Sequence, residues 1–452
     1  MENFINFSKI ELKNIKNVKN GEIDFKRKVT GIYGQNGSGK TALIDSIDIL
    51  KSVLCCKNLD YLYDLITVDS KNCSLKFVFT VEMYSRKYQV TLDLTLKKVD
   101  KGITGEKVKK VIVEKEILKY SDITCGKPSH KKILIGSDKN EVLKNNENFK
   151  SLISKYPMDL DVAKILSRHN SVSFLFSDEL LKLLEKENYE EVADFLKLFK
   201  KFGTSDLIII KNENLKTINL TPILPEDSFN ITDENITIDE NFYNDFSKII
   251  ENINTILSSI ISNIKLELNI DYKEVISENR TNIILQLFSV RDGRKIPFKH
   301  EASGVKKIVS LLSLLIPLSR NKEICLVIDD LDSNIFEYLF GNLLSALEMN
   351  SKGQLIFTSN NLRSLEILFK DCLVFTTTNE DEKYMRMKNI KTTNNLRNTY
   401  LREAFMHEQK ETLYDKANSI DIQIALSKVN HLGSKDWDEY NKFININSIF
   451  IF

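Results

Sequence analysis

The sequence lacks the features of a secreted or membrane-spanning protein. No apolar run reaches the roughly 18 residues that a membrane helix needs, and the N-terminus carries Glu2, Lys9 and Glu11 without an apolar signal core. No two cysteines form a C-x-x-C pair, so reduced, buried thiols are expected for Cys55, Cys56, Cys73, Cys125, Cys325 and Cys372. We therefore expect a cytoplasmic protein with no membrane contact.

An excess of charge of either sign is also absent. The 64 Lys and Arg residues almost balance the 63 Asp and Glu residues, which gives a formal net charge of +1. The composition therefore does not indicate nucleic-acid binding, although a local basic face is compatible with it. The five histidines show no zinc-ligand spacing, and no G-x-S-x-G nucleophile elbow occurs. Zinc and serine-triad chemistry are therefore not indicated.

What the sequence does contain is a phosphate-binding loop of the form G-x-x-x-x-G-K-[ST]. The apolar residues 29–33 precede it and the apolar stretch 42–47 follows it, which predicts a strand, a glycine-rich turn and a helix. Glycines let backbone N–H groups approach phosphate oxygens, and the helix N-terminus adds partial positive charge. The candidate nucleotide-binding residues are Gly34, Gln35, Asn36, Gly37, Ser38, Gly39, Lys40, Thr41 and Ala42.

A second apolar run supplies the acidic partner that such a loop needs. Residues 323–328 lead into Asp329, and Asp330 follows directly. We expect Asp329 and the Thr41 hydroxyl to hold Mg²⁺, and Asp330 to orient an attacking water. A helical stretch at 333–347 and another apolar run at 353–358 come next. Strand, helix and strand in this order predict a parallel α/β sheet.

The two halves of this site are far apart in the sequence, which predicts an insertion between them. Alternating residues predict a β-hairpin over 8–25 and further antiparallel strands over 74–119, whereas helix-period patterns occur at 179–202 and 242–264. We therefore divide the chain into 1–139, the first half of a nucleotide-binding head with a β lobe; 140–275, a mainly helical insertion; and 276–452, the second half of the head with a C-terminal tail.

These stretches resemble a known class of ATPases. The carrying segments are residues 34–41, 296–307, 326–333, 354–362 and 395–402. The chain resembles ABC-type ATPases of the SMC and RecF kind. More closely, it resembles bacterial AAA-family ATPases related to the ATPase half of OLD-family proteins, many of them from anti-phage defence. The likeness covers roughly residues 1–100 and 280–405. It implies an α/β ABC-type ATPase head with a parallel or mixed sheet, an antiparallel β lobe and a helical insertion.

The resemblance also implies ATP and Mg²⁺ as ligands and a head-to-tail homodimer or higher homo-oligomer. In such a dimer the phosphate loop of one copy and the signature loop of the other enclose each ATP. The signature position here is residues 301–304, with Ser303 and Gly304 as the candidate ATP contacts. Residues 331–334 correspond to the D-loop, which communicates across the dimer.

Three positions depart from the family pattern. Asp330 stands where Glu is common, Asn360 stands where a γ-phosphate-sensing His is common, and Ala302 stands where a Ser is common, although Ser303 can serve after a shift of one residue. Asp is shorter than Glu, and a misplacement of about 1 Å can cost about 100-fold in rate. We therefore expect secure ATP binding and slow hydrolysis, with Asp330 and Asn360 as the catalytic candidates. The alternative is that Asp330 reaches the water and turnover is ordinary.

We expect no nuclease domain in this chain. OLD-family proteins carry a Toprim nuclease with a D-x-D pair, and residues 436–439 match that spacing, but too little chain follows Arg402 to build the domain. We therefore expect a sensor or regulatory ATPase of an anti-phage (abortive infection) system that controls a separately encoded effector, a nuclease or toxin. The alternative is a RecF- or SMC-like ATPase of DNA repair or maintenance. Basic residues at 97–110 and 127–132 are either solvated hairpin surface or a DNA contact.

Overall fold

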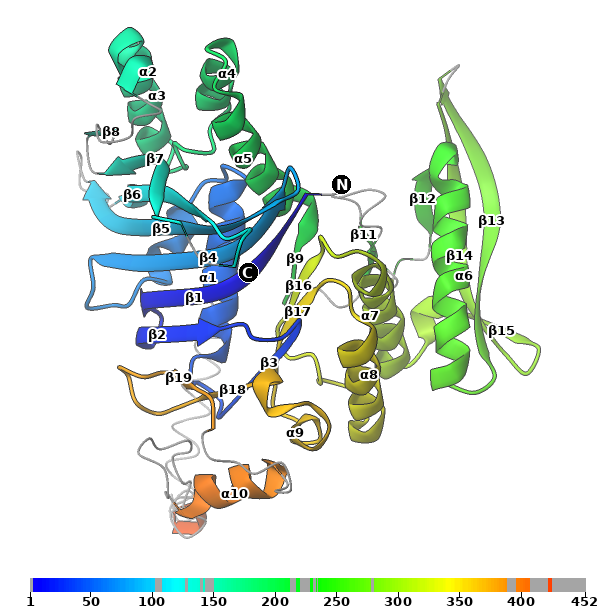
Figure 1. The fold of residues 1–452 in the computed structure, drawn as a ribbon. Coiled ribbons are helices and arrows are strands. Elements are labelled where there is room, and N and C mark those ends of the chain that lie inside the picture. The colour runs from blue at the N-terminus through cyan, green and yellow to red at the C-terminus, as the bar shows by residue number, and fades with distance from the viewer. Residues whose placement is uncertain are drawn as a thin grey trace, which may run out of the picture.

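Two large β-sheets enclose one helix, and smaller α/β elements extend the molecule to one side (Figure 1). The computed structural model describes residues 3–101, 108–126, 129–138, 141–142, 150–211, 217–219, 228–230, 233, 235–277, 280–387, 396–406 and 422–424. The residues 436–439 of the D-x-D match lie outside this part of the chain. Among the described residues, no helix is both long enough and apolar enough to cross a bilayer.

The central sheet is mostly parallel, as its apolar strands predict. Its order is β19 (Tyr384–Met385), β18 (Leu373–Thr376), β3 (Val29–Tyr33), β17 (Gln354–Ser359), β16 (Cys325–Ile328) and β9 (Leu207–Ile210), and only β19 runs antiparallel to its neighbour. Successive side chains face opposite sides. In β16, Val327 packs towards helix α1 (Lys40–Leu54), whereas Leu326 and Ile328 pack with α7 (Ser303–Arg320) and α8 (Glu337–Asn350).

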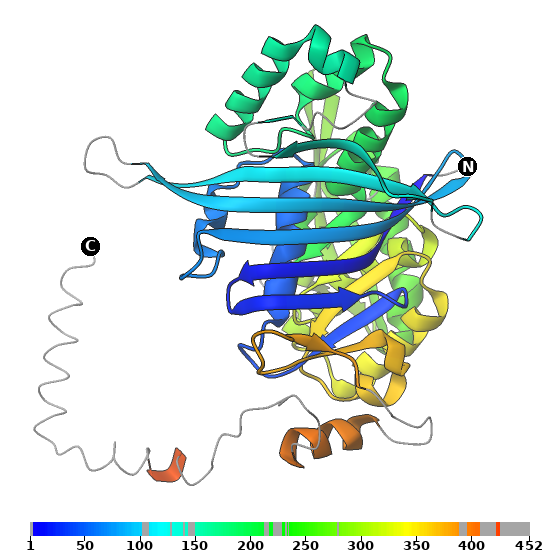
Figure 2. The ribbon, with the colours of Figure 1, turned by 60° about the vertical axis from the view of Figure 1, so that its left-hand side comes forward.

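The second sheet is antiparallel and contains the predicted N-terminal hairpin. Its order is β2 (Val18–Asp24), β1 (Phe4–Ile15), β4 (Asn72–Met83), β5 (Arg86–Lys101), β6 (Val108–Asp122), β7 (Lys132–Asp138) and β8 (Glu141–Val142). Figure 2 shows these long strands side by side. Helix α1 packs between this sheet and the central sheet, with Leu43, Ile47 and Leu50 in the shared core. The phosphate-loop helix is thus fixed on both sides.

In the segment predicted as a helical insertion, the described residues between β8 and β9 form four α-helices. They are α2 (Lys150–Lys155), α3 (Pro157–His169), α4 (Asp178–Lys186) and α5 (Glu190–Lys201). The stretch predicted as one helix over 179–202 is two, because Asn188 adopts a left-handed conformation with φ 59° between them. Helix α5 then passes through a π-turn (Phe202–Asp206) into β9. The prediction missed this strand, which returns to the central sheet from within the insertion.

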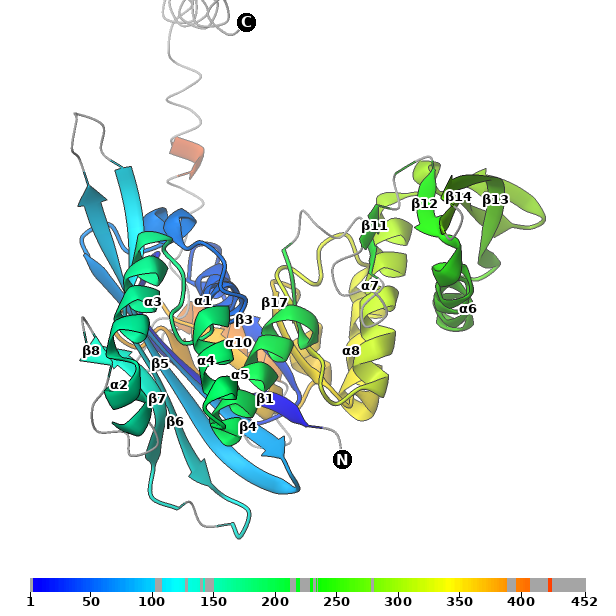
Figure 3. The same cartoon turned by 90° about the horizontal axis from the view of Figure 1, so that it is seen from above.

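The rest of the insertion belongs to a small α/β unit on the outer side of α7 (Figure 3). Strands β12 (Ile236–Asp239), β14 (Arg280–Arg291) and β13 (Ile264–Ser277) form its sheet, which α6 (Tyr243–Ile260) covers and β15 (Arg294–Pro297) extends. Helix α7 is shared, because Val309, Leu312 and Ile316 pack into this unit. Since β13 continues to Ser277, the predicted boundary at 275/276 falls inside a strand. The domain division otherwise stays a prediction.

The remaining described elements are short. Strands β10 (Thr217–Asn219) and β11 (Ser228–Asn230) pair with each other, and β10 contacts α7. Helix α9 (Ser364–Ile367) follows β17, and α10 (Leu396–Met406) contacts α9.

Candidate nucleotide and magnesium site

The phosphate loop connects β3 to α1 with the backbone that its glycines permit. Gly34, Gly37 and Gly39 have φ values of 155°, 76° and 104°. At Gly34 an added Cβ would lie 1.7 Å from Thr376 Oγ1 on β18, so only glycine fits there. The Lys40 ammonium is buried inside the loop and donates to the carbonyl oxygens of Gly34 at 2.7 Å and Gln35 at 3.1 Å. The loop is therefore preformed, with its cation pointing inward.

Neighbouring elements hold the loop from outside. The Asn17 side-chain amide, in the turn between β1 and β2, donates to the Gly37 carbonyl oxygen. The Ser38 hydroxyl bonds to the hydroxyl of Thr376, and the buried Tyr384 hydroxyl on β19 donates to the Gly39 carbonyl oxygen at 2.7 Å. Contacts from outside the loop thus fix the carbonyl oxygens of Gly37 and Gly39 and the side chain of Ser38.

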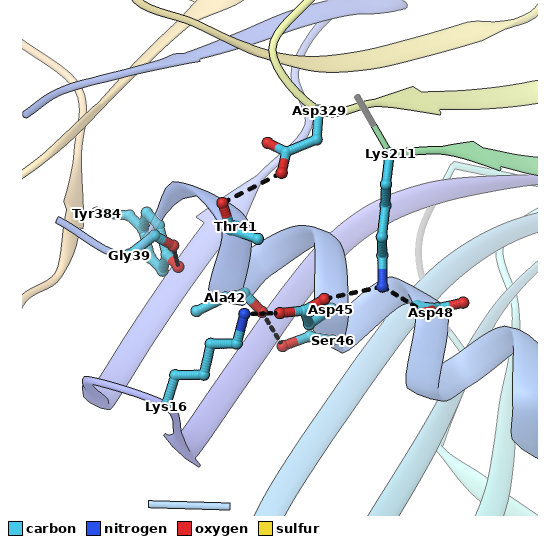
Figure 4. A network of polar contacts seen from close by, with 10 residues as sticks. All are labelled: Lys16, Gly39, Thr41, Ala42, Asp45, Ser46, Asp48, Lys211, Asp329 and Tyr384. Carbon is cyan, nitrogen blue, oxygen red and sulfur yellow. Dashed lines mark hydrogen bonds and ion pairs between the residues drawn. The ribbon is translucent and has the colours of Figure 1, made fainter. Parts of the chain in front are cut away.

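The structure brings together the two predicted magnesium ligands. The Thr41 hydroxyl donates to Asp329 Oδ2 at 3.1 Å, across the edge where the strands of the central sheet end (Figure 4). The other Asp329 oxygen, Oδ1, accepts the Thr358 hydroxyl at 2.5 Å, and the Asp329 backbone N–H donates to the Ile210 carbonyl oxygen at 2.9 Å. Both oxygens and the backbone of Asp329 are therefore held in place.

A hydroxyl and a carboxylate are donors that suit Mg²⁺. This ion prefers oxygen ligands and commonly binds through one or two protein groups together with water and phosphate oxygens. Among the described residues, no group of three or more His, Cys, Asp and Glu side chains is placed to hold a metal by itself. Thr41 and Asp329 thus fit an ion that arrives with a nucleotide, and their role as ligands remains a prediction.

Asp330 lies half-buried beside Asp329 in an unusual backbone conformation. Its φ is 52°, in the left-handed region that Asp adopts more readily than most residues. Its backbone N–H donates to Thr358 Oγ1 at 2.8 Å. Burial, followed by the charges of Asp329 and Asp332, raises the pKa of the Asp330 carboxyl. A carboxylate with a raised pKa is better suited to accept a proton than an ordinary Asp.

Asn360 follows β17 and is exposed at the same edge of the sheet. Its backbone N–H donates to Asp332 Oδ2 at 3.2 Å, so it contacts the segment predicted as the D-loop. This contact places Asn360 with the Asp329–Asp332 segment, and its proposed part in sensing phosphate remains a prediction.

The signature residues Ser303 and Gly304 form the first turn of α7. Ser303 is exposed, and an added Cβ on Gly304 would lie 3.2 Å from the Asn334 carbonyl oxygen, so this turn packs closely on the D-loop. The Lys307 ammonium, one turn further along, donates to the Asp330 carbonyl oxygen at 3.2 Å and to the Ser333 hydroxyl. Burial lowers the pKa of Lys307 to about 8. Signature helix and D-loop are therefore joined within one molecule.

Sequence reasoning missed several side chains of this site, and two had a visible signal. The run Leu207–Ile210 has four large apolar residues, which is typical of a buried parallel strand. Lys211 follows this run directly, just as Asp329 follows the apolar run 323–328. Thr358 ends the following apolar run. Lys307 and Tyr384 had no such signal, because their partners come from other parts of the chain.

The basic cluster at 97–110 is largely engaged in contacts within the molecule. Lys97 pairs with Glu114 at 3.0 Å and Lys109 with Asp64 at 2.7 Å, while Lys98 and Lys110 donate to backbone carbonyl oxygens. These contacts favour hairpin surface over a DNA contact. Lys107 and Lys127, which belong to the predicted clusters, lie outside the described residues.

Comparison with protein families assigns the chain to a family. A family model described as "AAA domain, putative AbiEii toxin, Type IV TA system" matches residues 29–362, which include the phosphate loop, Asp329 and Asn360. The chain belongs to this AAA-domain family. The resemblance to an AAA-family ATPase is thereby confirmed, and so is the predicted α/β fold with a mostly parallel sheet, an antiparallel β lobe and inserted helices.

The solved structures to which the chain is similar include SMC heads and a recombination mediator. The SMC head domain from Thermotoga maritima is 15% identical, with 85% of this chain and 99% of that chain covered and a TM-score of 0.38. The Pyrococcus furiosus Smc head bound to a ScpA domain is 13% identical, with 85% and 96% covered and a TM-score of 0.40. The recombination mediator protein RecF is 16% identical, with 79% and 92% covered and a TM-score of 0.35.

With TM-scores this low, the family assignment rests on the match to the family model alone. No curated protein sequence matches the chain.

Proposed function

We propose that this protein binds Mg²⁺–ATP between the phosphate loop and Asp329 and hydrolyses it slowly. The observation that carries the proposal is the 3.1 Å contact between Thr41 and Asp329 across the sheet edge, beside a loop whose Lys40 already points inward. The loop backbone and Lys40 bind the phosphates, and a bound Mg²⁺ would neutralise their charge. Asp330 accepts a hydrogen bond from the attacking water.

Slow turnover follows from the two side chains that would activate the attacking water and contact the γ-phosphate, Asp330 and Asn360. Asp330 is one methylene shorter than Glu, and its left-handed backbone is anchored through Thr358, so it cannot move far towards a nucleotide. Asn360 can donate a hydrogen bond but cannot take up a proton near neutral pH as His can. An ATP-bound form should therefore persist.

We further propose that the ATP-bound form is a homodimer or higher homo-oligomer that controls a separate effector protein in anti-phage defence. Ser303 is exposed at the start of α7, where the N-terminus of a helix suits a phosphate of a nucleotide held by another copy. The family description, which names a toxin and a toxin–antitoxin system, supports a role alongside a partner protein. Lys97 and Lys109 form salt bridges with acidic residues of the same molecule, which argues against DNA as the principal partner.

The decisive experiment measures molar mass by light scattering with and without ATP, together with ATP turnover. Wild-type protein should gain mass with ATP and Mg²⁺ and turn over well below one ATP per second. Lys40→Ala should stay at the ATP-free mass, whereas Lys57→Ala, at an exposed lysine just after α1, should behave as wild type.

An ATP-independent monomer would refute the dimer mechanism. Turnover of many ATP per second without a partner would refute slow hydrolysis. ATP-dependent, salt-sensitive duplex binding would instead favour the DNA-maintenance alternative.

A further inference from the structure

Five residues, Thr41, Asp45, Lys211, Ile210 and Asp329, form a closed ring of contacts and chain links behind the phosphate loop. Figure 4 shows two of its contacts, Asp45–Lys211 and Thr41–Asp329. Thr41 and Asp45 lie one turn apart on α1. The Asp45 carboxylate pairs with the Lys211 ammonium at 3.0 Å. Lys211 directly follows Ile210, whose carbonyl oxygen accepts the Asp329 backbone N–H at 2.9 Å, and Asp329 accepts the Thr41 hydroxyl at 3.1 Å. The ring thus joins the two predicted magnesium ligands by a second path through the protein.

Charge and burial make the Asp45–Lys211 contact a firm one. The Asp45 side chain is only 5% exposed, and it also pairs with Lys16 from the turn between β1 and β2. Lys211 bonds to Asp48 as well, at 2.8 Å. Burial alone would lower the pKa of Lys211, but its hydrogen bonds to Asp48 and Asp45 outweigh this and hold the pKa above its ordinary value. Lys211 therefore remains charged at any working pH.

Strand β9 is attached to α1 at its other end too. The Lys51 ammonium on α1 donates to the Leu207 carbonyl oxygen at the start of β9, at 2.7 Å. Lys211, directly after β9, pairs with Asp45 on α1, so both ends of β9 are fixed to this helix. Between them, β9 and β16 pair in parallel from Leu207–Cys325 to Ile210–Ile328. A displacement of Lys211 relative to α1 would therefore move the peptide group that anchors Asp329.

We propose that Asp45 and Lys211 are positioning residues that set the separation between Thr41 and Asp329, and through it the affinity of the site for Mg²⁺. The inference deepens the proposed ATP site and rests on it. Neither residue touches nucleotide or metal in this role. Asp45 acts through α1, which carries Thr41, and Lys211 acts through β9, whose Ile210 carbonyl oxygen accepts the Asp329 backbone N–H. Because β9 follows α5 after a single π-turn, the helices α2–α5 are attached to the site by the same strand.

The competing interpretation is that this cluster only stabilises the fold. A purely structural cluster would change the melting temperature and leave the magnesium dependence of nucleotide binding unchanged. Groups that orient metal ligands typically change metal affinity by about 10–100-fold when removed. The two interpretations therefore differ in a binding measurement that needs no catalytic turnover.

The test is ATP binding by calorimetry, first with EDTA and then across a Mg²⁺ titration. The variants are Asp45→Asn, Lys211→Met and Lys211→Arg, and the control is Lys200→Met, which removes a lysine that pairs with Asp178 on the helical segment. We expect Asp45→Asn and Lys211→Met to raise the half-saturating Mg²⁺ concentration about 10-fold, with ATP affinity in EDTA unchanged. Lys211→Arg should restore the wild-type value, and Lys200→Met should match it.

Each outcome decides the question. An unchanged half-saturating Mg²⁺ concentration in folded Lys211→Met would overturn the inference, as would an equal shift in Lys200→Met. If Asp45→Asn fails to fold, Lys211→Met decides, because the Lys211 side chain is 40% exposed and tolerates replacement. Wild-type protein that binds no ATP under any condition would instead overturn the proposed function, and this inference with it.

Discussion

Replacing Thr358 by valine removes one hydroxyl that two acidic residues share. Thr358 is 0% exposed, its oxygen accepts the Asp330 backbone N–H at 2.8 Å, and it donates to Asp329 Oδ1 at 2.5 Å. Valine keeps the shape and loses both bonds. A buried polar group left without a partner costs about 1–3 kcal/mol, and the half-buried Asp330 can recruit water, so the total loss should be about 2–3 kcal/mol.

Thermal unfolding followed by circular dichroism measures this loss. For a domain of moderate size, a destabilisation of about 2–3 kcal/mol lowers Tm by roughly 4–12 °C. The freed Asp329 oxygen should also raise the half-saturating Mg²⁺ concentration for ATP binding. Thr358→Ser is the matched control, because it keeps the hydroxyl and loses one methyl group, worth about 1 kcal/mol.

The reasoning would be refuted if Thr358→Val melted at the wild-type temperature, or if Thr358→Ser were the less stable of the two variants. Either result would mean that the hydroxyl does not hold the two acidic residues.

Three further predictions follow from other parts of the site and the fold. Lys307→Met should lower kcat several-fold and leave the ATP affinity unchanged, because it removes the contacts between α7 and the D-loop. Steady-state kinetics and equilibrium binding measure the two quantities, and a change in ATP affinity alone would contradict the prediction. Gly34→Ala should abolish ATP binding, since the new Cβ would lie 1.7 Å from Thr376 Oγ1, whereas Gly37→Ala has open space around its Cβ and should lose only the roughly 1–2 kcal/mol of folding stability that its positive φ costs. Calorimetry of ATP binding and thermal melting compare the two variants, and equal losses of binding and of stability would contradict the geometry. Lys164 is 5% exposed, its Nζ has no hydrogen-bond partner among the described residues, and burial lowers its pKa to about 8, so Lys164→Met should raise Tm at pH 7. That gain should shrink as pH rises from about 8 towards 10.5, because the folded protein then releases the proton before the unfolded chain does, and a Tm difference independent of pH would contradict the assignment.

Local patterns predicted the parts of the fold that depend on neighbouring residues. The spacing of Gly34, Gly39 and Lys40 predicted the phosphate loop, and the apolar run before Asp329 predicted its strand. The helical pattern at 333–347 predicted α8. In each case the signal and the structure lie within about 20 residues, which is the range over which helix and strand periodicity acts.

The same patterns did not predict where β9 belongs. Four apolar residues indicate a buried strand but not its neighbour, and β9 lies next to β16 only because their side chains fill the same two cores. Packing of this kind is decided by shape and burial among elements far apart in the chain, which one-dimensional periodicity does not record. For this reason periodicity alone leaves β9 inside the predicted helical insertion 140–275 and does not join it to the central sheet.

The sequence by itself determined the ligand class of this protein, because a phosphate loop is a local arrangement of backbone N–H groups that needs only Gly34 to Thr41 and the helix that follows. Tertiary structure decided how that loop is completed. Asp329 and Lys211 meet the helix after the loop only once the strands align. Thr358 and Lys307 likewise meet the segment from Asp329 to Ser333 only then. The reason is that a carboxylate, hydroxyl or ammonium acts over a few ångströms in space whatever its distance along the chain. The sequence thus identified the phosphate loop, and the packing of the central sheet assembled the groups around it.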